Sequence, residues 1–272
     1  MPQLTARSIG CRLSVVAAAA ATAGLLAGCG ANAAATPARP AATAAVQTSA
    51  PPSGVPVRVR RRIVGHAVSG APILAYVVGD PATRRRILLV GCVHGDERQG
   101  EVITRRLRTE TPPTGTVWWL IDQANPDGCR AGRRQNGHGV DLNRNSPWHR
   151  RRLDAPGGVH YAGPRPLSEP ESMAINRLVR RLRPTVSVWY HQHAALVDTS
   201  SGGRLALERA YAAESGLPLR AYGRVHGSIT TWQDTRFPSS TAFVVELPGG
   251  RLSAAAVARH LRAIRSISTG LP

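Results

Sequence analysis

Three strongly apolar runs, each followed closely by polar side chains, constrain the fold of this chain more than any other feature. They span residues 86–92 (RILLVGC), 116–122 (TVWWLID) and 186–190 (VSVWY). Continuous apolar runs of this length are typical of strands that are buried on both faces of a sheet. We therefore predict that all three are buried strands.

Segments with helical periodicity lie between these strands and after them. Apolar residues recur at helical spacing in the segment that ends near Arg108, and again over 253–267. A third helix is predicted over 168–183, because Ser168 can cap its first turn. Further strands are predicted at 57–64, 73–78 and 242–247, of which the first two form a hairpin around Ser69 and Gly70.

Strands that alternate with helices indicate an α/β domain with a largely parallel sheet. In such sheets, functional sites form where the carboxyl ends of the strands meet. His94, Asn125 and His191 each follow one of the apolar runs, and Glu246 lies near the end of the strand predicted at 242–247. We therefore expect these polar side chains to lie close together.

Composition limits the functions that fit this fold. Apolar residues make up 42% of the 272 residues, and no internal stretch reaches the length of about 18 apolar residues that would indicate membrane spans. The 35 cationic residues are all arginine and outnumber 16 acids, which gives a formal net charge of +19. We expect no nucleic-acid partner, because only 4% of the residues are aromatic and the N-terminus is that of an exported protein.

The N-terminus resembles the export signal of a bacterial lipoprotein. Arg7 and Arg12 form a positive region before a short apolar run at 13–26, and small residues lead from that run to Cys29. We predict a signal peptide over 1–28 and a lipid on Cys29. The lipid would anchor the protein on the outer face of the cytoplasmic membrane, whereas an ordinary secretory signal would release it.

A tether and one folded domain are predicted after this signal. Residues 29–55 are rich in Ala, Pro and Thr and are expected to be disordered, and 56–272 are expected to form the domain. The domain contains two cysteines, Cys92 and Cys129. Outside the cell they could form a disulfide, and two separate buried thiols are the alternative.

His94 and Glu97 have the spacing of a pair of metal ligands in a short loop. Catalytic zinc is held by three protein ligands, and two histidines with one glutamate are a known set. His191 is the third candidate, because it directly follows an apolar strand. His193 is an alternative, since it would face the same side if that strand continued.

Several short motifs follow one another in a fixed order along the domain. They are His94-x-x-Glu97, Asn125 to Gly128, Arg134 to Asn136, Asp141 to Asn145, His191 and Glu246. In this order they resemble the zinc carboxypeptidase family, and residues 163–171 resemble its small bacterial branch of murein peptide amidases. The resemblance covers residues 85–250. It implies an α/β/α sandwich around a mixed, largely parallel sheet of eight strands, and one zinc ion (Zn2+) per chain.

The resemblance also assigns roles to the motif residues. His94, Glu97 and His191 would hold the zinc, and Asp141 would orient the first histidine. The remaining roles concern the substrate. Arg134 would stabilise the oxyanion, Glu246 would be the general base, and Asn143 with Arg144 would bind a terminal carboxylate.

These roles predict a zinc metallocarboxypeptidase that hydrolyses an amide bond next to a free carboxylate, with cell-wall peptides as the favoured substrates. Two alternatives remain, a zinc deacylase of N-acyl amino acids and a non-catalytic lipoprotein that binds wall peptides. Arginine clusters at 60–62, 84–86 and 150–152 are expected to be solvated or to contact the anionic wall. Tyr222 is a candidate for the mobile tyrosine of digestive carboxypeptidases, but no motif fixes that match.

Overall fold

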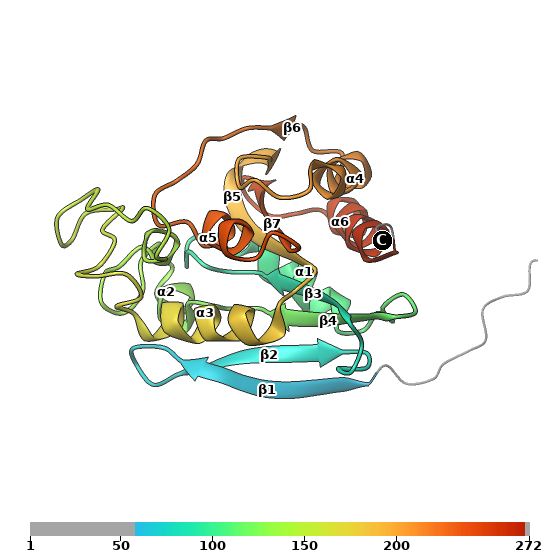
Figure 1. The fold of residues 1–272 in the computed structure, drawn as a ribbon, viewed down its shortest axis with the longest axis horizontal. Coiled ribbons are helices and arrows are strands. Elements are labelled where there is room, and N and C mark those ends of the chain that lie inside the picture. Colours follow the sequence, from blue (N-terminus) through green and yellow to red (C-terminus); the bar gives the residue numbers. More distant parts are fainter. Residues whose placement is uncertain (1–57, 270–272) are drawn as a thin grey trace, which may run out of the picture. The chain divides into compact units, whose positions relative to one another are not determined.

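The computed structural model describes residues 58–269, which form a mixed sheet with helices on both faces (Figure 1). The strands are β1 (Val59–His66), β2 (Pro72–Val78), β3 (Arg85–Val90), β4 (Thr116–Ile121), β5 (Val186–Asp198), β6 (Leu219–Arg220) and β7 (Thr241–Pro248). The helices are α1 (Gln99–Leu107), α2 (Pro126–Ala131), the short 3-10 helix η1 (Leu142–Arg144), α3 (Pro170–Leu182), α4 (Leu205–Ser215), α5 (Ile229–Arg236) and α6 (Ala254–Thr269). The predicted signal peptide, the tether and Cys29 lie outside the described residues.

The sheet follows the order β1-β2-β4-β3-β5-β6, and β7 pairs with β5. The β1–β2 hairpin and the β2–β4 pair are antiparallel. The other four pairings are parallel, namely β3 with β4, β3 with β5, β5 with β6 and β5 with β7. The predicted α/β fold is therefore confirmed, with seven strands in the described residues where the family resemblance implies eight.

Alternate side chains of the central strands pack into two apolar cores. On β3, Ile87 and Leu89 face one core, and Leu88 and Val90 face the other. Helices α1, α4 and α6 cover the first core, and α3 and α5 cover the second. Burial on both faces explains why this strand is continuously apolar in the sequence.

Some predicted elements differ from the structure. Ser168 does not cap α3, because its hydroxyl donates to Glu169 Oε1 (2.6 Å) and the helix begins at Pro170. Strand β5 continues to Asp198 instead of ending at Tyr190. Helices α2, α4 and α5, the 3-10 helix η1 and strand β6 have no counterpart among the predicted elements. In α5 the reason is visible, because the helix buries polar side chains that give no apolar period, namely Thr230, Thr231 and Gln233.

A disulfide joins Cys92, just after β3, to Cys129 in α2. Of the two states that the sequence allows, the structure therefore has the bonded one. The bond connects the start of the loop that carries His94 to the neighbouring helix. Within 58–269, no helix combines the length and the apolar character that crossing a membrane requires.

Candidate active site

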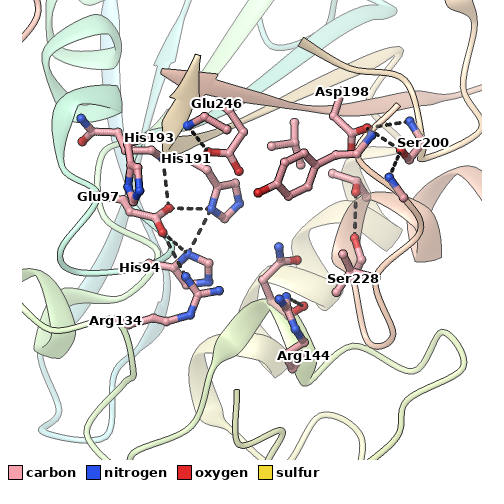
Figure 2. Close-up of a pocket in the computed structure, with 18 of the residues that line it drawn as sticks. His94, Glu97, Arg134, Arg144, His191, His193, Asp198, Ser200, Ser228 and Glu246 are labelled. Carbon is pink, nitrogen blue, oxygen red and sulfur yellow. Dashed lines mark hydrogen bonds and ion pairs between the residues drawn. The ribbon is translucent and has the colours of Figure 1, made fainter. Parts of the chain in front are cut away.

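The carboxyl ends of β3, β5 and β7 open into one pocket of about 650 Å³ (Figure 2). The predicted site residues that line it are His94, Glu97, Arg134, Asn143, Arg144, His191 and Glu246. Asp141 is fully buried and forms hydrogen bonds with three of these residues, His94, Arg134 and Asn143. The fold thus brings together all the candidate site residues within the described range.

His94, Glu97 and His191 form a buried group of potential metal ligands, called the ligand group below. His94 Nδ1 lies 3.0 Å from Glu97 Oε1, and His191 Nδ1 lies 2.8 Å from Glu97 Oε2. The two Nδ1 atoms are 3.1 Å apart. Three ligand atoms from two separate segments of the chain therefore meet at one point.

Asp141 orients His94. Its Oδ1 lies 3.0 Å from His94 Nε2 and also accepts the backbone N–H of Asn143 (2.9 Å). Both ring nitrogens of His94 face a carboxylate, but Glu97 is itself a candidate metal ligand and Asp141 is not. A proton on Nε2 that donates to Asp141 therefore leaves Nδ1 as the atom that can bind a metal. This geometry agrees with the role that the family resemblance gives to Asp141.

The charges in the ligand group stabilise one another. Burial lowers the pKa of His94, but Asp141 and Glu97 outweigh this effect and raise the pKa to about 8. Burial also acts against the Glu97 carboxylate, yet His191 and His94 hold its pKa far below the usual range. Glu97 therefore stays ionised, as a carboxylate ligand of a cation must.

The donor set fits zinc. Two imidazole nitrogens and one carboxylate are a known ligand set of catalytic zinc. At 3.1 Å, the two Nδ1 atoms would be opposed acceptors unless a proton or a cation lay beside them. His191 also has a buried Nε2 without a hydrogen-bond partner in the part of the chain that the structure describes.

His193 does not belong to the ligand group. A cis peptide bond links Gln192 to His193, and the His193 side chain is exposed at the edge of the pocket. Of the two histidines that the sequence offered, the structure places His191 next to Glu97.

A close backbone contact positions the ligand-bearing loop after β3. A Cβ on Gly95 would lie 1.9 Å from the carbonyl carbon of Gly128, so that only glycine fits there. Asn125 caps α2 by accepting the N–H of Gly128 (2.9 Å), and it donates to the carbonyl of Val93 (3.1 Å). The Asn125 to Gly128 motif therefore supports the ligands without being one.

Arg134 lies at the edge of the ligand group. Its Nε donates to Asp141 Oδ2 (2.9 Å) and its Nη1 donates to Glu97 Oε1 (3.0 Å). The guanidinium thus pairs with two carboxylates of the site while it lines the pocket. Contact between Arg134 and a substrate carbonyl stays a prediction.

Arg144 offers positive charge to the same pocket (Figure 2). Its Nη1 donates to the carbonyl of Asn143 (3.0 Å), whereas its Nε is buried without a partner among the described residues. Burial lowers the pKa of Arg144, although Asp141 acts in the opposite direction. A buried guanidinium with an unused N–H suits a carboxylate, which it can bind through two parallel hydrogen bonds.

Glu246 reaches the pocket from β7. It is the register partner of His191 on β5, and it is half-buried. Its Oε2 lies 3.5 Å from the backbone N–H of Ala194, which donates to it. A carboxylate therefore stands beside the ligand group with access to the pocket.

The far wall of the pocket contains residues that the motifs did not identify. Asp198 ends β5, and its Oδ1 accepts the N–H and the hydroxyl of Ser200 (2.9 and 2.5 Å) and the N–H of Tyr222 (2.9 Å). Tyr222 is 62% exposed and lines the pocket. The short apolar stretch at 194–197 is the one sequence signal that β5 continues to this wall.

Comparisons with known proteins identify the family of this chain. A family profile described as zinc carboxypeptidase matches residues 53–215. Murein peptide amidase A of Escherichia coli (strain K12) is 31% identical over 181 residues, which cover 62% of this chain and 74% of that protein. Murein peptide amidase A of Vibrio campbellii is 28% identical over 197 residues, which cover 68% and 77%.

Solved structures share the fold. The crystal structure of murein-tripeptide amidase from Escherichia coli O157 matches with a TM-score of 0.64 and 26% identity, and the match covers 85% of this chain and 97% of that one. Carboxypeptidase A from Helicoverpa armigera matches with a TM-score of 0.64 and 16% identity over 78% and 69%. At that identity the second match shows the fold alone.

Proposed function

Because this chain belongs to the zinc carboxypeptidase family, we propose that it is a zinc-dependent hydrolase that cleaves an amide bond next to a free carboxylate in cell-wall peptides. The observation that carries this proposal is the shared pocket of the ligand group, Glu246 and Arg144. A metal site, a base and a carboxylate-binding cation are the parts that such a hydrolysis needs.

His94, Glu97 and His191 would hold the zinc ion, which would act as a Lewis acid that lowers the pKa of water and polarises a carbonyl. Glu246 takes one proton from the attacking water as the new C–O bond forms. It passes that proton to the leaving nitrogen as the C–N bond breaks, so that the products are a carboxylic acid and an amine.

Two arginines bind and stabilise the substrate in this scheme. Arg134, which already borders the ligand group, supplies fixed positive charge for the oxygen that becomes negative. Arg144 binds the free carboxylate, and Asn143 beside it supplies a neutral hydrogen-bonding group to the same pocket.

The substrate class rests on the relatives named murein peptide amidase A. The proposed location follows the N-terminal sequence, a signal peptide over 1–28 with a lipid on Cys29. The disulfide between Cys92 and Cys129 supports an oxidising compartment. Removal of Arg7 and Arg12 with the signal peptide would leave 33 arginines against 16 acids, and this formal net charge of +17 would favour contact with the anionic wall.

A library of wall-derived peptides, with D and L residues and with free or amidated C-termini, tests this function. The zinc-loaded protein should release products with a new amine next to a free carboxylate, as read by mass spectrometry. The Glu246→Gln variant should release them at least about 100-fold more slowly. Cleavage of N-acyl amino acids alone would point to a deacylase, and binding of peptides without turnover would point to a non-catalytic protein.

A further inference from the structure

Gln192 connects two parts of the site that the proposed reaction must hold together. Its Oε1 accepts the backbone N–H of Gln99 (3.0 Å). Its Nε2 donates to the backbone carbonyls of Pro248 (3.0 Å) and Gly250 (3.1 Å). The side-chain amide of one residue thus joins the start of α1 to the end of β7.

On the α1 side, Gln192 completes the start of the helix. The first N–H groups of a helix have no partner within it, and Arg98 at the N-cap position makes no side-chain cap bond. Gln192 Oε1 supplies the missing acceptor, and the Gln192 backbone N–H donates to Glu97 Oε2 (3.2 Å). The residue after His191 therefore holds the segment that carries Glu97.

On the β7 side, Gln192 holds the chain that directly follows Glu246. Gly249 and Gly250 line the pocket, so this segment forms part of its wall. Gln99 extends the connection, because its side-chain Oε1 accepts the backbone N–H of Leu252 (3.0 Å). The segment 248–252 is therefore anchored to α1 through two glutamines.

We propose that Gln192 is a positioning residue that sets the distance between the Glu246 carboxylate and the ligand group. This inference rests on the proposed function, which makes Glu246 the base. Proton transfer requires hydrogen-bond distance, and a misplacement of about 1 Å can reduce a rate about 100-fold. Glu246 lies only two residues from the end of β7. Because little of the strand holds the chain beyond it, the position of Glu246 depends on the anchor at 248–252.

Two substitutions distinguish the bond of the Gln192 side chain to α1 from its bonds to the end of β7. Gln192→Glu keeps the acceptor for Gln99 and loses both donors, whereas Gln192→Met has similar length and loses all three side-chain bonds. Gln123→Met is the matched control, because Gln123 is also a partly buried glutamine with one bond, to Glu101 (3.1 Å), outside this pocket.

The first measurement is amide hydrogen exchange of the full chain without metal. We expect exchange at 249–252 to become about tenfold faster in both Gln192 variants and to stay unchanged in the control. The second measurement is steady-state kinetics with zinc. We expect kcat to fall about 10- to 100-fold, with KM within about threefold and unchanged zinc content.

Unchanged exchange at 249–252 in both variants would overturn the proposal. Parallel loss of zinc and activity would also overturn it, because Gln192 would then support the ligands and not the base. If Gln192→Met does not fold, the Gln192→Glu variant decides. A wild-type protein without hydrolytic activity would contradict the proposed function, whereas the exchange of the metal-free chain would still report on Gln192.

Discussion

His191 and Glu246 are register partners on the parallel strands β5 and β7. Side chains of paired residues in a sheet point to the same face, so this register places the base candidate next to a ligand of the predicted metal. The flanking residues Val245 and Leu247 point into the apolar core. A slip of β7 by one residue would turn Glu246 into that core. It would also turn Val245 and Leu247 out of the core.

Replacing Glu246 with Gln should lower kcat/KM by a factor of about 10² to 10⁴, because the amide cannot take the proton from water. Zinc content should not change, since Glu246 is outside the ligand group. Steady-state kinetics with a cleaved peptide and metal analysis of the same sample check this. Activity within a few-fold of the wild type would exclude Glu246 as the base.

Replacing Arg144 with Ala should weaken the hydrolysis of peptides that have a free carboxylate, with a loss of about 10- to 100-fold in kcat/KM. The same peptides with an amidated C-terminus should be cleaved equally by the variant and the wild type, because they offer no carboxylate to the guanidinium. Arg144→Lys is the matched control and should recover only part of the loss. An equal loss on both peptide forms would contradict carboxylate binding.

Replacing Asp141 with Asn should lower zinc affinity about 10- to 100-fold. The carboxylate holds His94 through Nε2 and Arg134 through Nε, and the amide can accept from only one of them. Competition with a fluorescent zinc chelator measures the affinity, and circular dichroism verifies that the variant is folded. A folded Asp141→Asn variant with wild-type zinc affinity would show that Asp141 does not orient the ligand.

Replacing Glu208 with Gln should raise the free energy of unfolding at pH 8 by about 1–3 kcal/mol. Burial, with the nearby charge of Asp198, raises the pKa of Glu208 from 4.5 to about 7, and its Oε1 has no partner among the described residues. The folded protein therefore binds more protons than the unfolded chain between these values, so this group makes stability fall as pH rises through that window.

The difference in the free energy of unfolding between Glu208→Gln and the wild type should be largest above pH 7. It should disappear near pH 4, where Glu208 is protonated and therefore neutral like the Gln that replaces it. Urea unfolding at pH 4 and pH 8 measures it. Asp234 acts in the same direction, because burial, with the charge of Glu208, raises its pKa to about 7. Removing the Glu208 charge therefore also relieves Asp234. A pH-independent difference would show that Glu208 is not titrated in this range.

Replacing Cys129 with Ala should lower the free energy of unfolding by about 3 kcal/mol, because the disulfide with Cys92 closes a loop of 37 residues. Urea unfolding of the oxidised proteins measures the loss, and the two proteins should differ much less in the presence of a reductant. Alkylation without reductant, followed by peptide mapping, should leave Cys92 and Cys129 of the wild type unlabelled. Labelling of both in the denatured protein would rule out the bond.

Local patterns were enough to predict the α/β class and to name candidate metal ligands, whereas the order of the motifs supplied the family resemblance that assigned their roles. The apolar runs predict buried strands because each run carries its own burial signal, and His94, Glu97 and His191 directly follow two of them. Ser168 shows the limit of such local rules. It has the right residue type for a helix cap, but the N-cap position is held by Glu169, and the Ser168 hydroxyl bonds to the Glu169 side chain.

Residue type and distance from a strand end are local properties, so the sequence could identify candidate ligands, and the order of its motifs could assign roles by resemblance. The tertiary structure sets how these residues combine. It chose His191 over His193, bonded Cys92 to Cys129, and carried β5 on to Asp198 at the far wall. These outcomes depend on strand register and on contacts between segments far apart in the chain, which no local pattern encodes.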